Sequence, residues 1–210
     1  MTDNLRAALR QAYDAGSLSR DQSVFPEWKS AERNRFLVHL QTKGIGRLLE
    51  VGAGTGRDGR FFADADCGAV TCIDLSPAMV QLCRDKGLDA LVMDAASLSF
   101  SPESFDAVYS FNSLLHLPKA ELPAVLQEIQ RVIVPGGLFY FGTYGGRDHE
   151  GVHEEDDHTP PRFFSFYEDA HIHQVASEYF DVLEFRSLEV PGPRAQIRFQ
   201  SILLQRPVKA

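Results

Sequence analysis

The chain has 210 residues, of which 44% are hydrophobic and 24% are charged, and its formal net charge is −8. These values are ordinary for a globular protein and exclude the disordered and fibrous classes. A chain of this length fits one domain that buries roughly 70% of the surface of its unfolded form, so it needs no disulfide or metal to fold. We therefore expect a single domain over residues 1–210.

Location and partners are constrained by the termini, the cysteines and the charge. The N-terminus lacks a continuous apolar segment and a small-residue cleavage site, which favours the cytoplasm. The apolar runs are too short to span a membrane. Cys67, Cys72 and Cys83 have no CxxC spacing and are interpreted as reduced packing residues. The negative charge would repel a polyphosphate backbone, so we expect no nucleic acid partner and a monomer or homodimer.

Short apolar runs that end in small, polar or turn residues predict seven strands. They cover residues 47–51, 69–74, 90–94, 105–111, 137–143, 181–188 and 197–205. Helix-length segments alternate with the early strands, which predicts a parallel sheet with helices on both faces. Only VPGP and its neighbours separate the last two strands, too little for a helical crossover. The expected fold is thus α/β: a doubly wound, seven-stranded mixed sheet whose seventh strand is antiparallel.

Several helix boundaries have local signals. Ser76 before Pro77 is an N-cap followed by proline at the first helical position. Apolar residues recur at helical spacing over 119–132, and the PGG at 135–137 is expected to stop that helix. An S-x-x-E capping box at 165–168 predicts a helix that runs to about residue 180.

The strongest functional signal is RLLEVGAGTGRDGRFF, in which a buried strand runs directly into Gly52, Gly54 and Gly56 and then into a helix. Glycines permit a tight turn and a close approach of backbone to ligand, and the free N–H groups at the helix start favour an anion. Gly54, Gly56 and Gly59 also match the G-x-G-x-x-G of nicotinamide-binding enzymes, but that motif should start directly at the strand end. The spacing that fits is E-x-G-x-G-x-G, beginning at Glu50.

This spacing resembles motif I of class I S-adenosylmethionine-dependent methyltransferases, and the resemblance extends from about residue 47 to 142. Asp74 ends the second strand, as does the acidic residue that binds both ribose hydroxyls in that family, and we expect it at an exposed strand end. Asp94, with Ala95 beside it, looks like the residue that receives the adenine amino group. FDAVYSFNSLLHLP and LQEIQRVIVPGGLFYF are similar to the fourth strand and to the helix and strand after it, and the closing hairpin agrees with the family's reversed seventh strand.

The resemblance implies S-adenosylmethionine as the cofactor and S-adenosylhomocysteine as the product. Met79 and Leu98 would be apolar walls for the adenine, although both also suit the core, and the two aspartates could instead cap helices. The candidate cofactor-binding residues are Glu50, Gly52, Ala53, Gly54, Gly56, Asp74, Leu75, Met79, Asp94, Ala95, Phe111 and Asn112.

Methyl transfer from a sulfonium is an in-line displacement, so the main task is to align acceptor, methyl and sulfur. A base is needed only if the acceptor must lose a proton. The candidate catalytic residues are Tyr144 and His116, which lies just past the fourth strand and whose pKa could fall in the useful range. His116 could also simply cap a turn before Pro118, and His149, His153 and His158 are weighed for the same catalytic role.

Two segments are expected to close over the acceptor. Residues 1–44 form an N-terminal extension with helices at 5–15 and 27–42, ahead of a core over 45–210. The second segment is 143–166, whose His, Asp and Glu residues could hold a divalent ion but suit a solvated flap better, so no metal is expected. The residues expected at the acceptor are Tyr13, Trp28, His149 and Phe163, and for Trp28 plain packing on the sheet edge is the alternative.

The sequence therefore predicts a methyltransferase that acts on a small organic molecule at an oxygen or nitrogen atom. Two alternatives stay open. One is an NAD(P)-binding oxidoreductase, which would use the other glycine register. The other is a non-catalytic protein that binds S-adenosylmethionine and assists a partner, because fold alone does not fix function.

Overall fold

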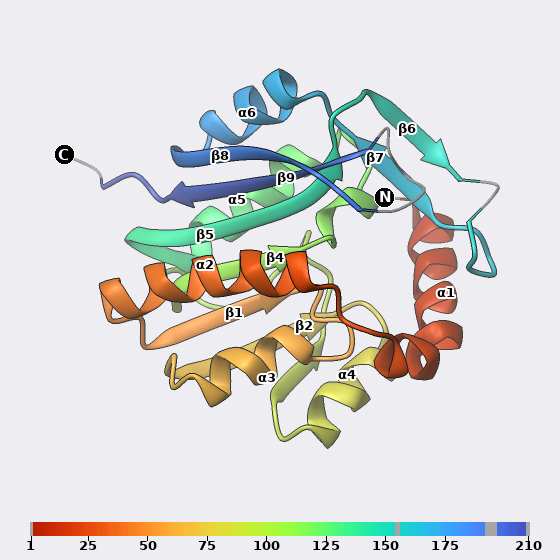
Figure 1. Ribbon diagram of the computed structural model, residues 1–210, viewed down its shortest axis with the longest axis horizontal. Helices are drawn as coiled ribbons and strands as arrows, with labels where there is room; N and C mark the ends of the chain where they lie inside the picture. The colour runs from red at the N-terminus through yellow and green to blue at the C-terminus, as the bar shows by residue number, and fades with distance from the viewer. Residues whose placement is uncertain (1, 154–155, 192–196, 209–210) are drawn as a thin grey trace.

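A seven-stranded mixed sheet forms the centre of the computed structural model, which describes residues 2–153, 156–191 and 197–208 (Figure 1). Its strands are β1 (Arg47–Val51), β2 (Ala69–Asp74), β3 (Asp89–Val92), β4 (Phe105–Phe111), β5 (Ile133–Gly145), β8 (Asp181–Glu189) and β9 (Arg198–Gln205). Their order is β3-β2-β1-β4-β5-β9-β8, and β9 runs antiparallel to both β5 and β8. The expected doubly wound sheet with a reversed seventh strand is confirmed. Part of the turn before β9, residues 192–196, lies outside the described residues.

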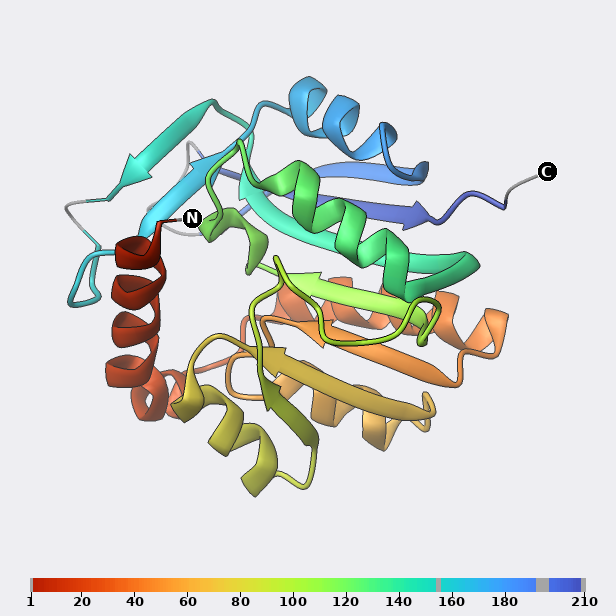
Figure 2. The same ribbon diagram turned by 180° about the vertical axis from the view of Figure 1, so that it is seen from behind.

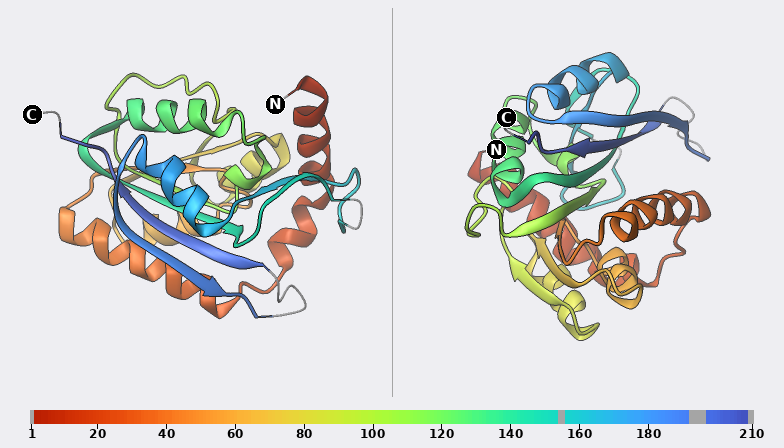
Figure 3. Two further views of the ribbon diagram at one scale, coloured as in Figure 1. Left: turned by 90° about the horizontal axis from the view of Figure 1, so that it is seen from above. Right: turned by 90° about the vertical axis from the view of Figure 1, so that its left-hand side faces the viewer.

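Five helices cover the two faces of this sheet (Figure 3). They are α2 (Glu27–Lys43), α3 (Arg57–Asp64), α4 (Pro77–Asp85), α5 (Leu122–Val132) and α6 (Asp169–Ser177). On one face Phe36 of α2 and Phe62 of α3 are buried against Tyr109 of β4. On the other face Ile129 of α5 and Ile172 of α6 are buried. Each such side chain contributes about 1.5–3 kcal/mol when fully removed from water, so both faces stabilise the sheet.

The helix before β5 ends earlier than expected. α5 stops at Val132 and β5 begins at the next residue, where Ile133 pairs with Phe105 of β4. The PGG at 135–137 therefore lies inside the strand, and it coincides with a shift in register between β4 and β5. Strand pairing, and not the glycine pair, terminates this helix.

The prediction of a helix that starts at a capping box at 165–168 is wrong. Ser165 is buried in β7 (Phe163–Phe166), and α6 begins at Asp169 after Glu168, whose side chain makes no capping hydrogen bond. β7 pairs antiparallel with β6 (His149–Val152), so the expected flap at 143–166 contains a β-hairpin. Phe164 and Phe166 pack with Leu115, and this long-range burial outweighs the local helix signal.

One helix, α1 (Asp3–Gln22), belongs to neither layer. It stands at the carboxyl ends of the parallel strands, next to β6 and β7 (Figures 1 and 2). Asp14 in its middle accepts hydrogen bonds from Ser76 Oγ at 2.5 Å and from the Ala78 amide at 3.1 Å. α1 thus helps cap the N-terminus of α4, where Ser76 is the N-cap and Pro77 follows, as expected. No described helix combines the length and apolar character needed to cross a bilayer.

Candidate active site

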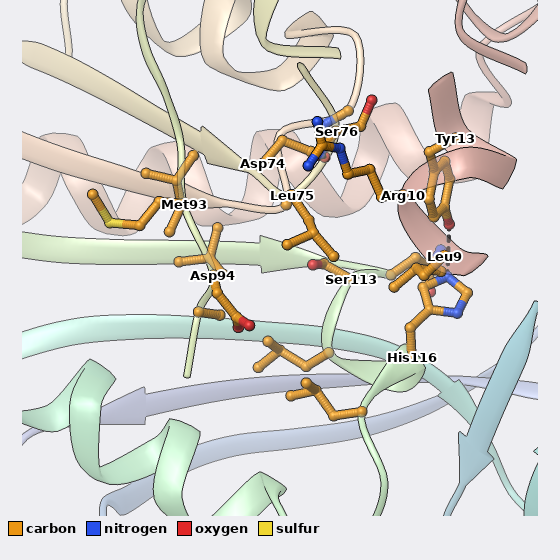
Figure 4. A pocket seen from close by; sticks show the side chains of 18 of the residues that line it. Leu9, Arg10, Tyr13, Asp74, Leu75, Ser76, Met93, Asp94, Ser113 and His116 are labelled. Carbon is orange, nitrogen blue, oxygen red and sulfur yellow. Dashed lines mark hydrogen bonds between the residues drawn. The ribbon is translucent and has the colours of Figure 1, made fainter. Parts of the chain in front are cut away.

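An open cleft lies at the carboxyl ends of β1, β2 and β4, and α1 forms its outer wall (Figure 4). This is where ligands bind in open α/β sheets. We call it the first compartment. It is lined by Leu9, Arg10, Tyr13, Arg20, Val51, Gly52, Gly54, Ile73, Asp74, Leu75, Ser76, Met93, Asp94, Ala95, Phe111, Asn112, Ser113, Leu114, His116 and Leu117.

The glycine loop after β1 forms the floor of the cleft. Gly52 has φ +72°, and a Cβ atom there would lie 1.9 Å from Ser113 Oγ, so only glycine fits. Gly54, with φ +54°, faces both the cleft and Arg20. Gly56 has a different role, because a Cβ atom on it would lie 2.9 Å from Cys83 Sγ of α4. It permits α3 and α4 to approach each other and is absent from the lining of the cleft.

Asp74, at the end of β2, holds the loop in place. Its carboxylate accepts hydrogen bonds from the Gly54 amide and from the Ser76 amide, both at 2.9 Å. Burial raises the pKa of this carboxyl, and the two amides oppose that shift. A carboxylate has about four acceptor sites, so acceptor capacity remains on the side that faces the cleft. Asp74 is thus partly buried at the cleft, and the expectation of an exposed strand end is wrong.

Asp94 is engaged by α1. One carboxylate oxygen accepts from the Ala96 amide at 2.9 Å, and the other pairs with Nε of Arg6 at 2.5 Å. Arg6 also approaches Glu121 at 3.5 Å. No local pattern indicates Arg6 as a site residue, because it lies 88 residues from Asp94.

A hydrogen-bonded chain links His116 to both segments expected to cover the acceptor. Nδ1 of His116 lies 2.8 Å from the Phe163 carbonyl oxygen, which only accepts, so this nitrogen carries the proton. Nε2 then accepts from the Tyr13 hydroxyl at 2.6 Å, and Arg162 donates to the same hydroxyl at 3.0 Å. Arg162 is held by an ion pair with Asp156 at 2.7 Å.

This environment makes His116 a poor base. It is 4% exposed, and burial lowers its pKa to about 3, with the Phe163 carbonyl opposing the shift. The imidazole is therefore neutral near pH 7 and binds a proton weakly. The expectation of a pKa in the range useful for catalysis is wrong, because desolvation exceeds the stabilisation from one carbonyl.

Several expected site residues lie elsewhere. Met79 and Leu98 are buried in the core, and Met93, which sequence reasoning missed, lines the cleft instead. Tyr144 packs with Trp28 and Phe199, outside the lining of the cleft, so the structure does not place it as a base for this compartment.

The flap residues likewise make structural contacts. The ring of His149 in β6 contacts Phe166. The contact of Phe163 with His116 is the hydrogen bond that its backbone oxygen accepts. His153 contacts Phe164, whereas His158 lies beside Tyr13 with ring centres 5.8 Å apart.

A second compartment adjoins the first one, with which it shares Gly52, Gly54 and Asn112. It is lined by Arg20, Ser23, Val24, Phe25, Pro26, Lys29, Glu50, Gly52, Ala53, Gly54, Thr55, Arg57, Asp58, Phe111 and Asn112. Glu50 is 3% exposed beneath the loop, and burial raises its pKa well above the usual range. Asp58 pairs with Arg33 at 3.0 Å.

Asn112 stands where the two compartments meet. It has φ +54°, a conformation that asparagine tolerates better than most residues. The nitrogen and the oxygen of its side-chain amide, Nδ2 and Oδ1, are both buried and have no hydrogen-bond partner among the described residues. Because buried polar atoms are normally paired, these two atoms indicate a position for ligand atoms.

Within the described ranges, no group of three or more His, Cys, Asp and Glu side chains is arranged to hold a metal ion. Two members of the expected cluster, Glu154 and Glu155, lie outside those ranges. A third, Asp156, is engaged by Arg162.

Residues 48–137 match the family model described as a methyltransferase domain. The malonyl-[acyl-carrier protein] O-methyltransferase of Geobacter sulfurreducens is 31% identical over 67% of this chain and 54% of its own length. The tRNA (carboxymethyluridine(34)-5-O)-methyltransferase of Arabidopsis thaliana is 29% identical over 62% of this chain and 31% of its own. Thus the chain spans about half or less of the length of these curated relatives.

The fold is also that of a solved methyltransferase. The Burkholderia thailandensis 1,6-didemethyltoxoflavin-N1-methyltransferase, with 1,6-didemethyltoxoflavin and S-adenosylhomocysteine bound, superposes with a TM-score of 0.75 over 99% of this chain and 91% of its own, at 18% identity. This chain belongs to the class I S-adenosylmethionine-dependent methyltransferases. S-adenosylmethionine is the cofactor of that family, and the resemblance seen in the glycine loop and the two aspartates is confirmed at the level of the family.

Proposed function

We propose that this chain transfers a methyl group from S-adenosylmethionine to an oxygen or nitrogen atom of a small organic molecule. The observation that carries the proposal is the convergence of three features on one cleft. The glycine loop, Asp74 and Asp94 follow three adjacent strands and all line the first compartment.

The residues present suit the cofactor. Asp74 would accept hydrogen bonds from the two ribose hydroxyls, because its carboxylate is fixed by two amides and keeps acceptor capacity. Asp94 and Ala95 would receive the adenine amino group, and Leu75 and Met93 supply apolar walls. The unpartnered amide of Asn112 suits the polar end of the ligand.

When bound, S-adenosylmethionine supplies a methyl group already activated by a sulfonium, so the chain's own residues mainly align and enclose. Alignment of this kind lowers a barrier by about 7–11 kcal/mol in the most favourable cases. α1 forms the outer wall of the cleft, and the hydrogen bond between Tyr13 and His116 fixes its position there. Neutral His116 positions Tyr13, and its lowered pKa makes it a weak base for an acceptor proton.

A small acceptor suits a cleft that α1 covers. The net charge of −8 opposes a polyphosphate substrate over most of the surface. The Burkholderia enzyme, which has 1,6-didemethyltoxoflavin bound, is consistent with this choice, whereas the Arabidopsis relative is named for a tRNA. For this reason tRNA belongs in the test.

The test has two stages. Calorimetry with S-adenosylhomocysteine and with NADH separates the methyltransferase from the oxidoreductase, because we expect binding of the former only. Labelled S-adenosylmethionine is then incubated with the protein and with small-molecule extract, bulk tRNA or cell-extract protein. Label in the small-molecule fraction supports the proposal. Label in tRNA or protein alone contradicts the acceptor class, and cofactor binding without any transfer favours a non-catalytic partner protein.

A further inference from the structure

Helix α1 reaches both carboxylates that the proposed function assigns to the nucleoside. Its Asp14 accepts a hydrogen bond from Ser76 Oγ, and the Ser76 amide donates in turn to Asp74. Its Arg6 contacts Asp94 without an intermediate, with 2.5 Å between Nε and Oδ2. The contact of Arg6 is thus the direct one, and it acts on a carboxylate at the wall of the first compartment (Figure 4).

The carboxylate of Asp94 has one fixed contact on each of its oxygens. The Ala96 amide donates to Oδ1 at 2.9 Å, and Arg6 donates to Oδ2. The torsion that turns an aspartate carboxylate about its bond to Cβ is broad, so a single hydrogen bond leaves the plane of the group poorly determined. Two donors on opposite oxygens determine that plane. Each oxygen has two lone pairs and can still accept a hydrogen bond from a ligand in the cleft.

The guanidinium of Arg6 is itself held between two carboxylates. Its Nη2 lies 3.5 Å from Oε2 of Glu121, the residue before α5. Arg6 is absent from the lining of the first compartment, so it acts on a ligand there through Asp94. The side chains of Arg6 and Asp94 are 28% and 27% exposed, and an ion pair as exposed as this contributes little to stability. What the pair supplies is therefore mainly the direction of the carboxylate.

The direction of the Asp94 carboxylate decides which purine it can bind. An ion-paired carboxylate only accepts hydrogen bonds, whereas the 6-amino group of adenine donates them. A 6-oxo purine in the same place would bring two acceptors together, and both would lose their hydrogen bonds to water. A site that is built around one hydrogen bond strongly rejects the analogue that cannot make it. A carboxylate of fixed direction should therefore prefer adenine more strongly than one that can turn away.

We propose that Arg6 is a positioning residue for the cofactor. It orients the Asp94 carboxylate towards the 6-amino group of the adenine and thereby sets the preference of the site for adenine over a 6-oxo purine. This inference rests on the proposed function, in which the first compartment takes the nucleoside and Asp94 receives the amino group.

The first test compares two nucleosides on the unmodified chain. S-adenosylhomocysteine carries the 6-amino group, and S-inosylhomocysteine carries a 6-oxo group instead. Calorimetry gives the two dissociation constants, and we call the second divided by the first the base ratio. We expect a base ratio of about ten or more, the effect of one hydrogen bond to a charged group. A base ratio near unity overturns the inference, because no preference then exists to be set. If neither nucleoside binds, the proposed function itself fails, which is a different result.

The second test removes the arginine. Arg6→Met should lower the base ratio about threefold or more, the effect of weakening one hydrogen bond. If Arg6 only held α1 in place, both nucleosides would lose affinity by the same factor. A folded Arg6→Met protein with an unchanged base ratio therefore overturns the proposal. The matched control is Lys86→Met, which removes another ion pair of α1, the 2.9 Å contact with Asp21 between side chains 27% and 29% exposed. It should keep the base ratio of the unmodified chain, and a threefold fall there would show that loosening α1 is sufficient and overturn the role of Arg6. Thermal melts check that both variants are folded.

The third test asks whether Arg6 acts through Asp94. Asp94→Asn should lower the base ratio on its own, because an amide can donate to a 6-oxo group as well as accept from a 6-amino group. In that background Arg6→Met should change the base ratio by less than about twofold, since the two residues form one contact and their effects are not additive. A further fall of about threefold or more in the double variant would mean that Arg6 acts without Asp94, and it would overturn the positioning role.

Discussion

Replacing Asp74 by asparagine tests the cofactor site most directly. Asparagine has the same shape but only one acceptor oxygen, whereas the carboxylate accepts from the Gly54 and Ser76 amides and faces the cleft. Loss of hydrogen bonds to a charged group should weaken S-adenosylhomocysteine binding by about 1.5–3 kcal/mol, which corresponds to roughly 10- to 150-fold in the dissociation constant. Leaving one amide without its acceptor should also lower the free energy of unfolding by about 1–3 kcal/mol.

The assay is calorimetry at neutral pH, with urea unfolding in parallel to separate affinity from stability. A pH series tests the direction in which affinity changes with the protonation of Asp74. Because burial raises the pKa of Asp74, the carboxylate protonates at a higher pH than an ordinary aspartate, and affinity should fall as the pH drops through that raised value. Asp74→Asn should lack this dependence. A folded Asp74→Asn protein with an unchanged dissociation constant would remove Asp74 from the site.

Three further substitutions test the loop and the contacts of α1. Gly52→Ala should destabilise the protein by about 1–3 kcal/mol more than Gly87→Ala in urea unfolding. Both glycines have similar positive φ, but a Cβ atom at position 52 would lie 1.9 Å from Ser113 Oγ, whereas one at position 87 would meet nothing within 4 Å. Equal losses would refute the clash. Tyr13→Phe should lower the free energy of unfolding by about 0.5–1.5 kcal/mol and speed proteolysis of α1, because the Tyr13 hydroxyl donates a hydrogen bond to His116. An unchanged cleavage rate argues against that contact. Burial lowers the pKa of His116, so the folded protein disfavours its protonated form. The contribution of His116 to the free energy of unfolding is therefore fully present above about pH 6.5 and falls by about 1.4 kcal/mol per pH unit towards pH 3. His116→Gln should show a shallower dependence of stability on pH.

The parts of the site that could be predicted are those whose chemistry is adjacent in sequence. The glycine loop follows β1 directly and Asp74 is the last residue of β2, so strand ends and turn residues were sufficient to place them together. Parallel strands align their carboxyl ends, and this geometry brings residues distant in the chain to one edge.

The parts that could not be predicted depend on long-range contacts. Arg6 reaches Asp94 across 88 residues, and Arg162 reaches Tyr13 across 149, with no local pattern to indicate either pair. The burial of His116 has the same origin, because Phe163 and Tyr13 enclose it from other segments. Its pKa is thus a property of the assembled site, which the sequence around the histidine does not determine.

Local signals failed where pairing partners decided the structure. The S-x-x-E pattern at 165–168 is chemically sound for a helix start, but Ser165 pairs with Glu150 across a hairpin that buries Phe164. A cap contributes about 1 kcal/mol, whereas burial of one phenylalanine contributes about 1.5–3 kcal/mol. The burial of Phe164 therefore selects the strand over the helix, and α6 begins only after β7 ends.

Many of the contacts that hold α1 at the cleft are polar, although Ala12 is buried and the Tyr13 ring packs against His116. Side chains of Arg6 and Asp94 remain 28% and 27% exposed, and an ion pair of this kind contributes only about 0.2–1 kcal/mol. The hydrogen bond from Ser76 to Asp14 adds a contribution of similar order. Further contacts add to these two, among them the hydrogen bond of Tyr13 with His116, the ion pair of Asp21 with Lys86 and the burial of Ala12, so together they are a sizeable part of the about 5–15 kcal/mol that unfolds a typical domain. A ligand that enters beneath α1 must therefore displace several of these contacts, and a variant that removes one of them, such as Tyr13→Phe, should open more readily.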